Sequence, residues 1–199
     1  MGYLVAVFIR PTRLDDLPAV YRVCHETGLP DDGSPRSPEL LGHVYAGPYL
    51  VAPRTRSVVV VDEEGVAGYL LCARDTRAHE RWVEQHWLPG LRADFPLDVE
   101  RSPVDQEIVE LLHAPRIAPD EVVAEFPAHL HIDLLSRCRG RGLGSSLIED
   151  LCSFLAGEGV RGVHLEVGAD NEGAIRRYRR LGFVDLGRGA SSLYLGRRL

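Results

Sequence analysis

The clearest alternation of apolar and polar positions in the chain runs from residue 129 to residue 135. Its two faces are Leu130, Ile132 and Leu134 on one side and His129, His131 and Asp133 on the other. This period of two predicts a strand. Leucines then recur at helical spacing from Leu143 to Leu155, and the pattern ends at Gly157 and Gly159. A strand over 163–167, a helix that begins at Asn171 and ends before Gly182, and a final pair of strands complete an α/β unit.

The first half of the chain predicts a simpler order of elements. We expect a strand over 4–9, a helix over 14–26 and a second helix that opens at Ser37-Pro38. Two valine-rich runs, 57–62 and 66–72, flank Glu63-Glu64-Gly65 and predict a hairpin. Residues 76–119 hold both tryptophans, several prolines and a helical stretch near 104–112. We interpret this segment as an insertion between the third and fourth strands of a single domain over 1–199.

Composition narrows the class of protein. The chain has 199 residues, 45% of them apolar, and a formal net charge of −6. These values exclude a disordered chain and disfavour a general nucleic-acid binder, which needs a basic surface. All 23 basic residues are arginine. Mechanisms that need a lysine nucleophile or a P-loop lysine are therefore excluded.

Apolar runs and the spacing of cysteines and histidines indicate where the protein is located and whether it binds a metal. No apolar run approaches the roughly 18 residues that span a bilayer, and the amino-terminal segment has no cleavage site. The four cysteines form no CxxC pair, so we expect reduced, buried thiols in a cytoplasmic protein. His129 and His131 could form a metal pair by alternation, but no third ligand has suitable spacing. We expect no metal site.

A glycine- and arginine-rich loop, residues 139–146, lies between the alternating strand and the next helix. Bare backbone N–H groups and a helix start suit a pyrophosphate, although a flexible turn with two solvated arginines would have the same sequence. The Rossmann pattern needs a glycine where Ser145 stands, although Glu166 could take the place of its ribose-binding acid. A methyltransferase loop would place an acid directly before Gly140, and Asp133 is too far upstream.

Two patterns resemble the GNAT superfamily of N-acetyltransferases. Arg139-x-x-Gly142-x-Gly144 matches the [Q/R]xxGx[G/A] signature of that superfamily. About thirty residues later, Asn171-x-x-Ala174-x-x-x-Tyr178-x-x-x-Gly182-Phe183 resembles the pattern of its last helix. The segment 60–71, Trp87-Leu88-Pro89, His131-Ile132-Asp133 and Leu195-Gly196-Arg197 also resemble the acetyltransferase-like domain of protein O-GlcNAcases and its free-standing bacterial relatives.

The resemblance implies a fold and a cofactor. The expected fold is a mixed α/β GNAT fold, a mostly antiparallel, splayed sheet of about seven strands with helices on both faces. Acetyl-CoA would enter between the fourth and fifth strands as co-substrate. The resemblance places its contacts at Leu134, Leu135, Ser136, Arg139, Gly140, Arg141, Gly142, Leu143, Gly144, Ser145, Asn171, Ala174 and Tyr178.

Acetyl transfer to an amine needs a base, a polarised thioester carbonyl and a proton for the departing thiolate. By resemblance, Tyr178 is the general acid, although its spacing also suits a core tyrosine. Asp133 is our first candidate for the general base, with His131 or a water as alternatives. Asp133 could instead have a purely structural role. Asn171 could serve only as a helix cap.

We therefore expect an N-acetyltransferase that acts on an amine, either a small molecule or a protein, as a monomer or homodimer. A protein that binds acetyl-CoA or coenzyme A without turnover, or an interaction domain, is the competing hypothesis. Tyr45, Tyr49, Trp82 and Trp87 suit the core, or the wall of an acceptor pocket.

Overall fold

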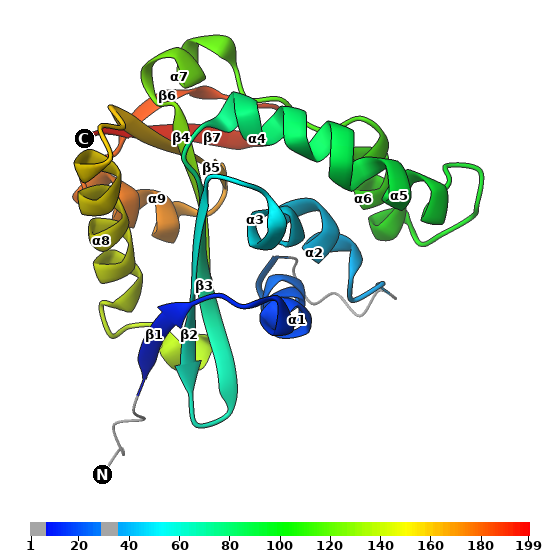
Figure 1. The fold of residues 1–199 in the computed structure, drawn as a ribbon, viewed down its shortest axis with the longest axis horizontal. Coiled ribbons are helices and arrows are strands. Elements are labelled where there is room, and N and C mark those ends of the chain that lie inside the picture. The colour runs from blue at the N-terminus through cyan, green and yellow to red at the C-terminus, as the bar shows by residue number, and fades with distance from the viewer. Residues whose placement is uncertain (1–6, 29–35) are drawn as a thin grey trace.

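The computed structural model describes residues 7–28 and 36–199 and arranges them around one twisted sheet (Figure 1). The seven strands are β1 (Phe8–Pro11), β2 (Thr55–Asp62), β3 (Gly65–Ala73), β4 (Ala128–Leu134), β5 (Gly162–Gly168), β6 (Val184–Arg188) and β7 (Ser192–Arg198). Their order in the sheet is β1-β2-β3-β4-β5-β7-β6. Every neighbouring pair is antiparallel except β4 and β5, which are parallel. The mixed, mostly antiparallel sheet is the one that the resemblance implied.

Helices cover both faces of the sheet. The early helices are α1 (Leu17–Gly28), after a 3-10 turn η1 (Leu14–Asp16), then α2 (Leu40–Tyr45) and α3 (Gly47–Val51). The late helices are α8 (Leu143–Gly157), after a 3-10 turn η3 (Ser136–Cys138), and α9 (Glu172–Arg180). In Figure 1, α8 lies on one side of β2 and β3 and the early helices lie on the other. The buried leucines of α8, which the periodicity marked, pack in the main core.

The connection from β3 to β4 is mostly helical. It contains α4 (Thr76–Trp82), a π-helical stretch η2 (Val83–Trp87), α5 (Leu88–Asp94), α6 (Pro103–His113) and α7 (Asp120–Glu125). The sequence predicted α6 alone among these. Figure 1 shows α4, α5 and α6 extending beside α2 and α3. Because these helices lie against α2 and α3, they can form a wall at one end of the sheet.

The structure bears on two predicted boundaries in the first half of the chain. The expected strand over 4–9 is seen as β1 from Phe8, while residues 4–6 lie outside the described residues. The prediction that Ser37-Pro38 opens the second helix was wrong, because α2 begins at Leu40. The Ser37 hydroxyl donates to Asp105 at 2.7 Å rather than capping the helix. That partner is 68 residues away, so local sequence could not reveal it.

Candidate active site

The sheet opens between β4 and β5. Their parallel ladder joins Ala128 to Val163 and His129 to His164, and no further pair follows among the described residues. Beyond this point β4 continues to pair with β3, and β5 with β7. The two strands therefore separate toward the carboxyl end of β4, where they no longer pair with each other and a ligand could pair with their backbone instead.

A cavity of about 740 Å³ occupies this opening on the side of α1, α8 and α9. Most of the residues that the resemblance implied line it: Asp133, Leu134, Arg139, Gly140, Gly142, Leu143, Gly144, Ser145, Asn171, Ala174 and Tyr178. Leu135, Ser136 and Arg141 do not line it. The Leu135 N–H donates to the Ala67 carbonyl at 2.8 Å, so this residue holds β4 against β3 instead.

The glycine loop has a backbone that favours glycine. Gly140 and Gly142 have φ angles of 79° and 77°, which side chains with a Cβ rarely adopt. A Cβ at either position would meet no protein atom within 4 Å, so the space beside them is open. Gly142 is also the N-cap of α8, whose free N–H groups and positive dipole end favour an anion.

Two interactions hold this loop in place. The Arg139 Nε donates to the Leu134 carbonyl at 2.7 Å, which ties the start of the loop to the end of β4. Arg137 donates through Nε to the buried carboxylate of Asp62 at 2.6 Å. Asp62 also accepts from the Glu64 N–H in the β2–β3 turn. The loop therefore rests on two strands of the sheet.

Tyr178 lines the cavity from α9, and its ring packs against Phe183 with the ring centres 5.7 Å apart. Its hydroxyl has no hydrogen-bond partner within the described residues. Desolvation raises the pKa of Tyr178 to about 12, so the hydroxyl keeps its proton at neutral pH. Asn171 caps α9 by accepting from the Ala174 N–H at 3.1 Å. The capping role anticipated for Asn171 is therefore present at the rim of the same cavity.

Asp133 lies in the same cavity and is held from β3. The Tyr69 hydroxyl donates to its Oδ2 at 2.5 Å. Desolvation raises the pKa of Asp133, while Tyr69, Thr27 and the charge of Arg139 act against that rise. A carboxylate in this state is a stronger base than an exposed aspartate.

A second cavity, of about 550 Å³, lies on the other side of the opening. The helices between β3 and β4 form its outer wall, and His129, His131 and His164 form part of its floor. Six residues line both cavities: Tyr45, Arg116, Leu130, His131, Leu165 and Glu166. The two cavities therefore meet where β4 and β5 separate.

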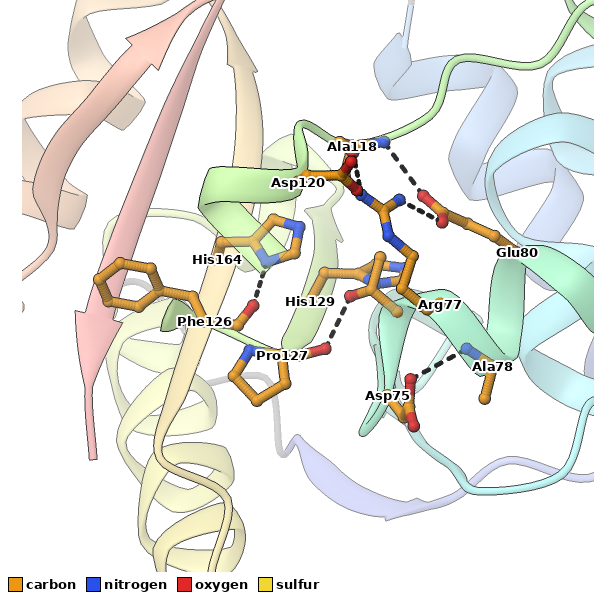
Figure 2. A network of polar contacts seen from close by, with 11 residues as sticks. Asp75, Arg77, Ala78, Glu80, Ala118, Asp120, Phe126, Pro127, His129 and His164 are labelled. Atoms are coloured by element: carbon orange, nitrogen blue, oxygen red, sulfur yellow. Dashed lines mark hydrogen bonds and ion pairs between the residues drawn. The ribbon is translucent and has the colours of Figure 1, made fainter. Parts of the chain in front are cut away.

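Figure 2 shows how the outer wall is fixed. Arg77 on α4 donates to Glu80 and Asp120, each at 2.5 Å, and to the Ala118 carbonyl at 2.6 Å. The Ala118 N–H donates to Glu80 at 3.0 Å. These contacts join α4 to the segment before α7, so the wall has a defined position over β4.

The histidines of the second cavity are uncharged at neutral pH. Desolvation lowers the pKa values of His79 and His131 to about 4 and those of His129 and His164 below the usual range. His129 is fully engaged, with Tyr49 at Nε2 and Thr76 at Nδ1. No lone pair of His129 is left for a metal, despite its alternation with His131.

Sequence reasoning did not single out His79. His79 and Tyr49 stack with their ring centres 4.4 Å apart, although they come from α4 and α3. Tyr45 and Tyr49 line the second cavity, whereas Trp82 and Trp87 do not. Trp87 donates to the His43 carbonyl at 2.9 Å and packs between helices.

Comparisons with known proteins agree with this architecture. The acetyltransferase (GNAT) family model matches residues 105–183. The crystal structure of SsHAT is 34% identical and superposes with a TM-score of 0.86, covering 97% of this chain and 98% of that one. Rat protein O-GlcNAcase is 25% identical over 186 residues, 89% of this chain. An uncharacterized N-acetyltransferase of Methanocaldococcus jannaschii is 49% identical over 47 residues, 24% of this chain and 21% of its own length.

These likenesses fix the family. The chain belongs to the GNAT acetyltransferase family, in which acetyl-CoA-dependent N-acetyl transfer is the typical reaction. It spans about a fifth of the length of the O-GlcNAcases that it matches. Among the described residues no helix is long and apolar enough to cross a membrane.

Proposed function

We propose that this chain binds acetyl-CoA in the larger cavity and transfers the acetyl group to an amine that occupies the second cavity. The observation that carries the proposal is the junction of the two cavities at the separation of β4 and β5. A thioester placed at this junction would be open to a nucleophile from the other side. The six shared residues, which include His131, surround the point of transfer.

The coenzyme would be held mainly by backbone groups. The N–H groups of the loop at Gly140–Gly144 and the start of α8 suit the pyrophosphate, and the free edge of β4 suits the amide-bearing arm. Arg139 is already bound to the Leu134 carbonyl, so its main contribution is to hold the loop. Asn171 and Ala174 form the opposite rim of the cavity.

The reaction balances with two protein groups. The amine lone pair forms the N–C bond, and the C–S bond breaks as the carbonyl is restored. Tyr178 donates its proton to the departing thiolate, and Asp133 takes a proton from the amine nitrogen. Tyr178 is then reprotonated, so the net products are an N-acetylamine and the coenzyme A thiol.

His131 and Asp133 have separate tasks in this proposal. They are two residues apart on one face of β4, about 7 Å along the strand. Neutral His131 lines both cavities and can accept a hydrogen bond from the amine, which positions the nitrogen. A single water can bridge that nitrogen to Asp133, which lines the larger cavity and not the second one.

We also propose a cytoplasmic location, because Cys24, Cys72, Cys138 and Cys152 are all buried free thiols. A chain that binds coenzyme without turnover is the alternative. It is less well supported, because Tyr178 has a protonated hydroxyl without a protein partner in the coenzyme cavity.

Calorimetric titration with acetyl-CoA tests the proposal, with NAD as the comparison ligand. We expect micromolar binding of acetyl-CoA and none of NAD. Gly142→Val should abolish binding, because its side chain would occupy the space beside the loop. Gly159→Val is the matched control: Gly159 also has a positive φ, 73°, and open space around it, but it follows the far end of α8. Unchanged binding by Gly142→Val would overturn the assignment of the loop.

A further inference from the structure

Every carboxylate that lines the second cavity forms an ion pair with an arginine of the same chain, and Glu80 and Asp120 share Arg77. Each pair lies within ion-pair distance: Glu80 and Asp120 with Arg77, Glu84 with Arg92, and Glu166 with Arg116. Glu166 also accepts a hydrogen bond from Ser192. No lining carboxylate among the described residues is therefore without an arginine partner.

Apart from these ion pairs and Arg81, the polar lining is uncharged. The four histidines are neutral, and Tyr45, Tyr49 and Tyr194 keep their protons because desolvation raises their pKa values. Most of the rest of the wall is apolar and includes Val44, Pro48, Val83, Leu88, Leu111, Ile117 and Ala118. An ammonium group would lose its hydration here without gaining an unpaired carboxylate as its partner, which disfavours its entry.

One polar group in this wall lacks a partner. The His79 Nδ1 is buried and forms no hydrogen bond within the described residues. Its ring is only 7% exposed and is fixed against Tyr49 by stacking. Buried polar atoms are almost always hydrogen-bonded, so an orphaned one in the wall of a cavity indicates a polar group on the occupant.

We propose that the acceptor is an aromatic primary amine, uncharged at neutral pH, whose ring lies beside Tyr49 and whose polar substituent reaches His79. This inference rests on the proposed function and adds its substrate class. The amine nitrogen would lie beside His131 at the junction of the cavities. Ring conjugation keeps such an amine neutral, so it needs no counter-ion in this cavity and can act as the nucleophile without first losing a proton.

The transfer uses the same two protein groups, Tyr178 and Asp133, as the proposed reaction. The neutral nitrogen attacks the thioester carbon, the C–S bond breaks, and the sulfur takes the proton of Tyr178. The attack leaves a positive charge on the nitrogen, which makes its N–H acidic, so the proton passes readily to Asp133. A strong base is then unnecessary, which agrees with a cavity whose histidines are weak bases.

The first experiment compares two isomers, p-toluidine and benzylamine, as acceptors for the wild-type protein with saturating acetyl-CoA. The isomers match in size, but only benzylamine is protonated at pH 7. We expect kcat/KM, measured by thiol release, to be at least about tenfold higher for p-toluidine. The ratio of kcat/KM for p-toluidine to kcat/KM for benzylamine should fall as the pH rises to 9, because benzylamine then loses its proton. Equal or better use of benzylamine at pH 7, or no turnover of p-toluidine, overturns the proposal.

The second experiment tests His79. In the wild type, 4-aminophenol should have a lower KM than p-toluidine, in which a methyl group replaces the hydroxyl. His79→Phe keeps the stacked ring but removes both nitrogens, so it should erase this difference. His86→Phe, at an exposed histidine outside the cavity, should leave it intact. A hydroxyl preference that persists in a folded His79→Phe protein overturns the role of His79.

The two proposals fail in different ways. Absence of acetyl-CoA binding in the calorimetric titration contradicts the proposed function itself. Binding of acetyl-CoA together with acetylation of spermidine or a lysine peptide, and not of aromatic amines, contradicts only the substrate class.

Discussion

Tyr69 and Asp133 face each other across the β3–β4 ladder, and the Tyr69 hydroxyl donates to the Asp133 carboxylate at 2.5 Å. Tyr69 is 1% exposed, so the core fixes the position of the carboxylate from below. The backbone of β3 approaches closely here because Gly68 has no side chain. A Cβ at Gly68 would lie 2.7 Å from the Asp133 carbonyl oxygen. The geometry of the proposed base is therefore set by the strand beside it.

Tyr69→Phe should shift the pH dependence of turnover. Loss of the donated hydrogen bond raises the pKa of Asp133 further, so the acid limb of the kcat profile should move to higher pH. The free energy of unfolding should fall by about 1–3 kcal/mol. Tyr21→Phe removes another buried hydroxyl, one bonded to His43, and should cost stability without moving the profile. An unmoved acid limb in Tyr69→Phe would argue that Asp133 is only structural.

Tyr178→Phe should lower kcat by about 100-fold, since a positioned acid typically contributes 10²–10⁴. The affinity for acetyl-CoA should hardly change, because the ring stays packed against Phe183. Stopped assays of thiol release and a parallel calorimetric titration separate these two quantities. Wild-type turnover with a good acceptor would remove the general-acid role.

Asp62→Asn should destabilise the protein by about 2 kcal/mol at pH 7, because Arg137 would lose its charged acceptor. The hydrogen bond from Arg137 lowers the pKa of Asp62 below its ordinary value of 3.8. A lowered carboxyl pKa stabilises the fold above the unfolded value, and that contribution is lost as the pH falls through the folded value. Denaturant melts of both proteins should therefore differ at pH 7 and converge below about pH 4. A constant difference would contradict the ion-pair explanation.

The fold should lose stability as the pH falls from 6.5 toward 4. In this window the unfolded chain protonates histidines that the folded chain keeps neutral, among them His79 and His131, with pKa values of about 4. Each such histidine costs up to about 1.4 kcal/mol per pH unit. Thermal melts at pH 7, 6 and 5 measure the slope. His79→Phe should reduce it and His86→Phe should not; an equal slope in all three proteins would contradict this account.

Much of the larger cavity could be predicted from the sequence, because its loop and flanking elements lie close together in the chain. The alternation of 129–135, the glycines of the loop and the leucines of α8 lie within about thirty residues, and each pattern reports its own backbone geometry. The observed β4, the loop and α8 follow these patterns. The order of the two cofactor motifs then indicated the family.

The second cavity depends on contacts between distant segments. His79 meets Tyr49 from 30 positions away, and His129 meets Tyr49 from 80 positions away. Pro89 and Gly90 also interrupt the helical signal of α5, so the helical wall was not predicted there. No local pattern could show that these rings would gather around one space.

The short β4–β5 ladder leaves the sheet incomplete as a hydrogen-bonded structure. In the part of the chain that the structure describes, two residue pairs join β4 to β5, so a ligand chain with its own amides would act as an additional strand in the opening. Under the proposed function, binding of the coenzyme would also complete the hydrogen bonding between β4 and β5, so the two events would occur together. The coenzyme would stabilise the fold by RT ln(1 + [L]/Kd), where [L] is the concentration of free acetyl-CoA. The stability of the contact between the β1–β4 half and the β5–β7 half of the sheet would therefore rise with the acetyl-CoA concentration.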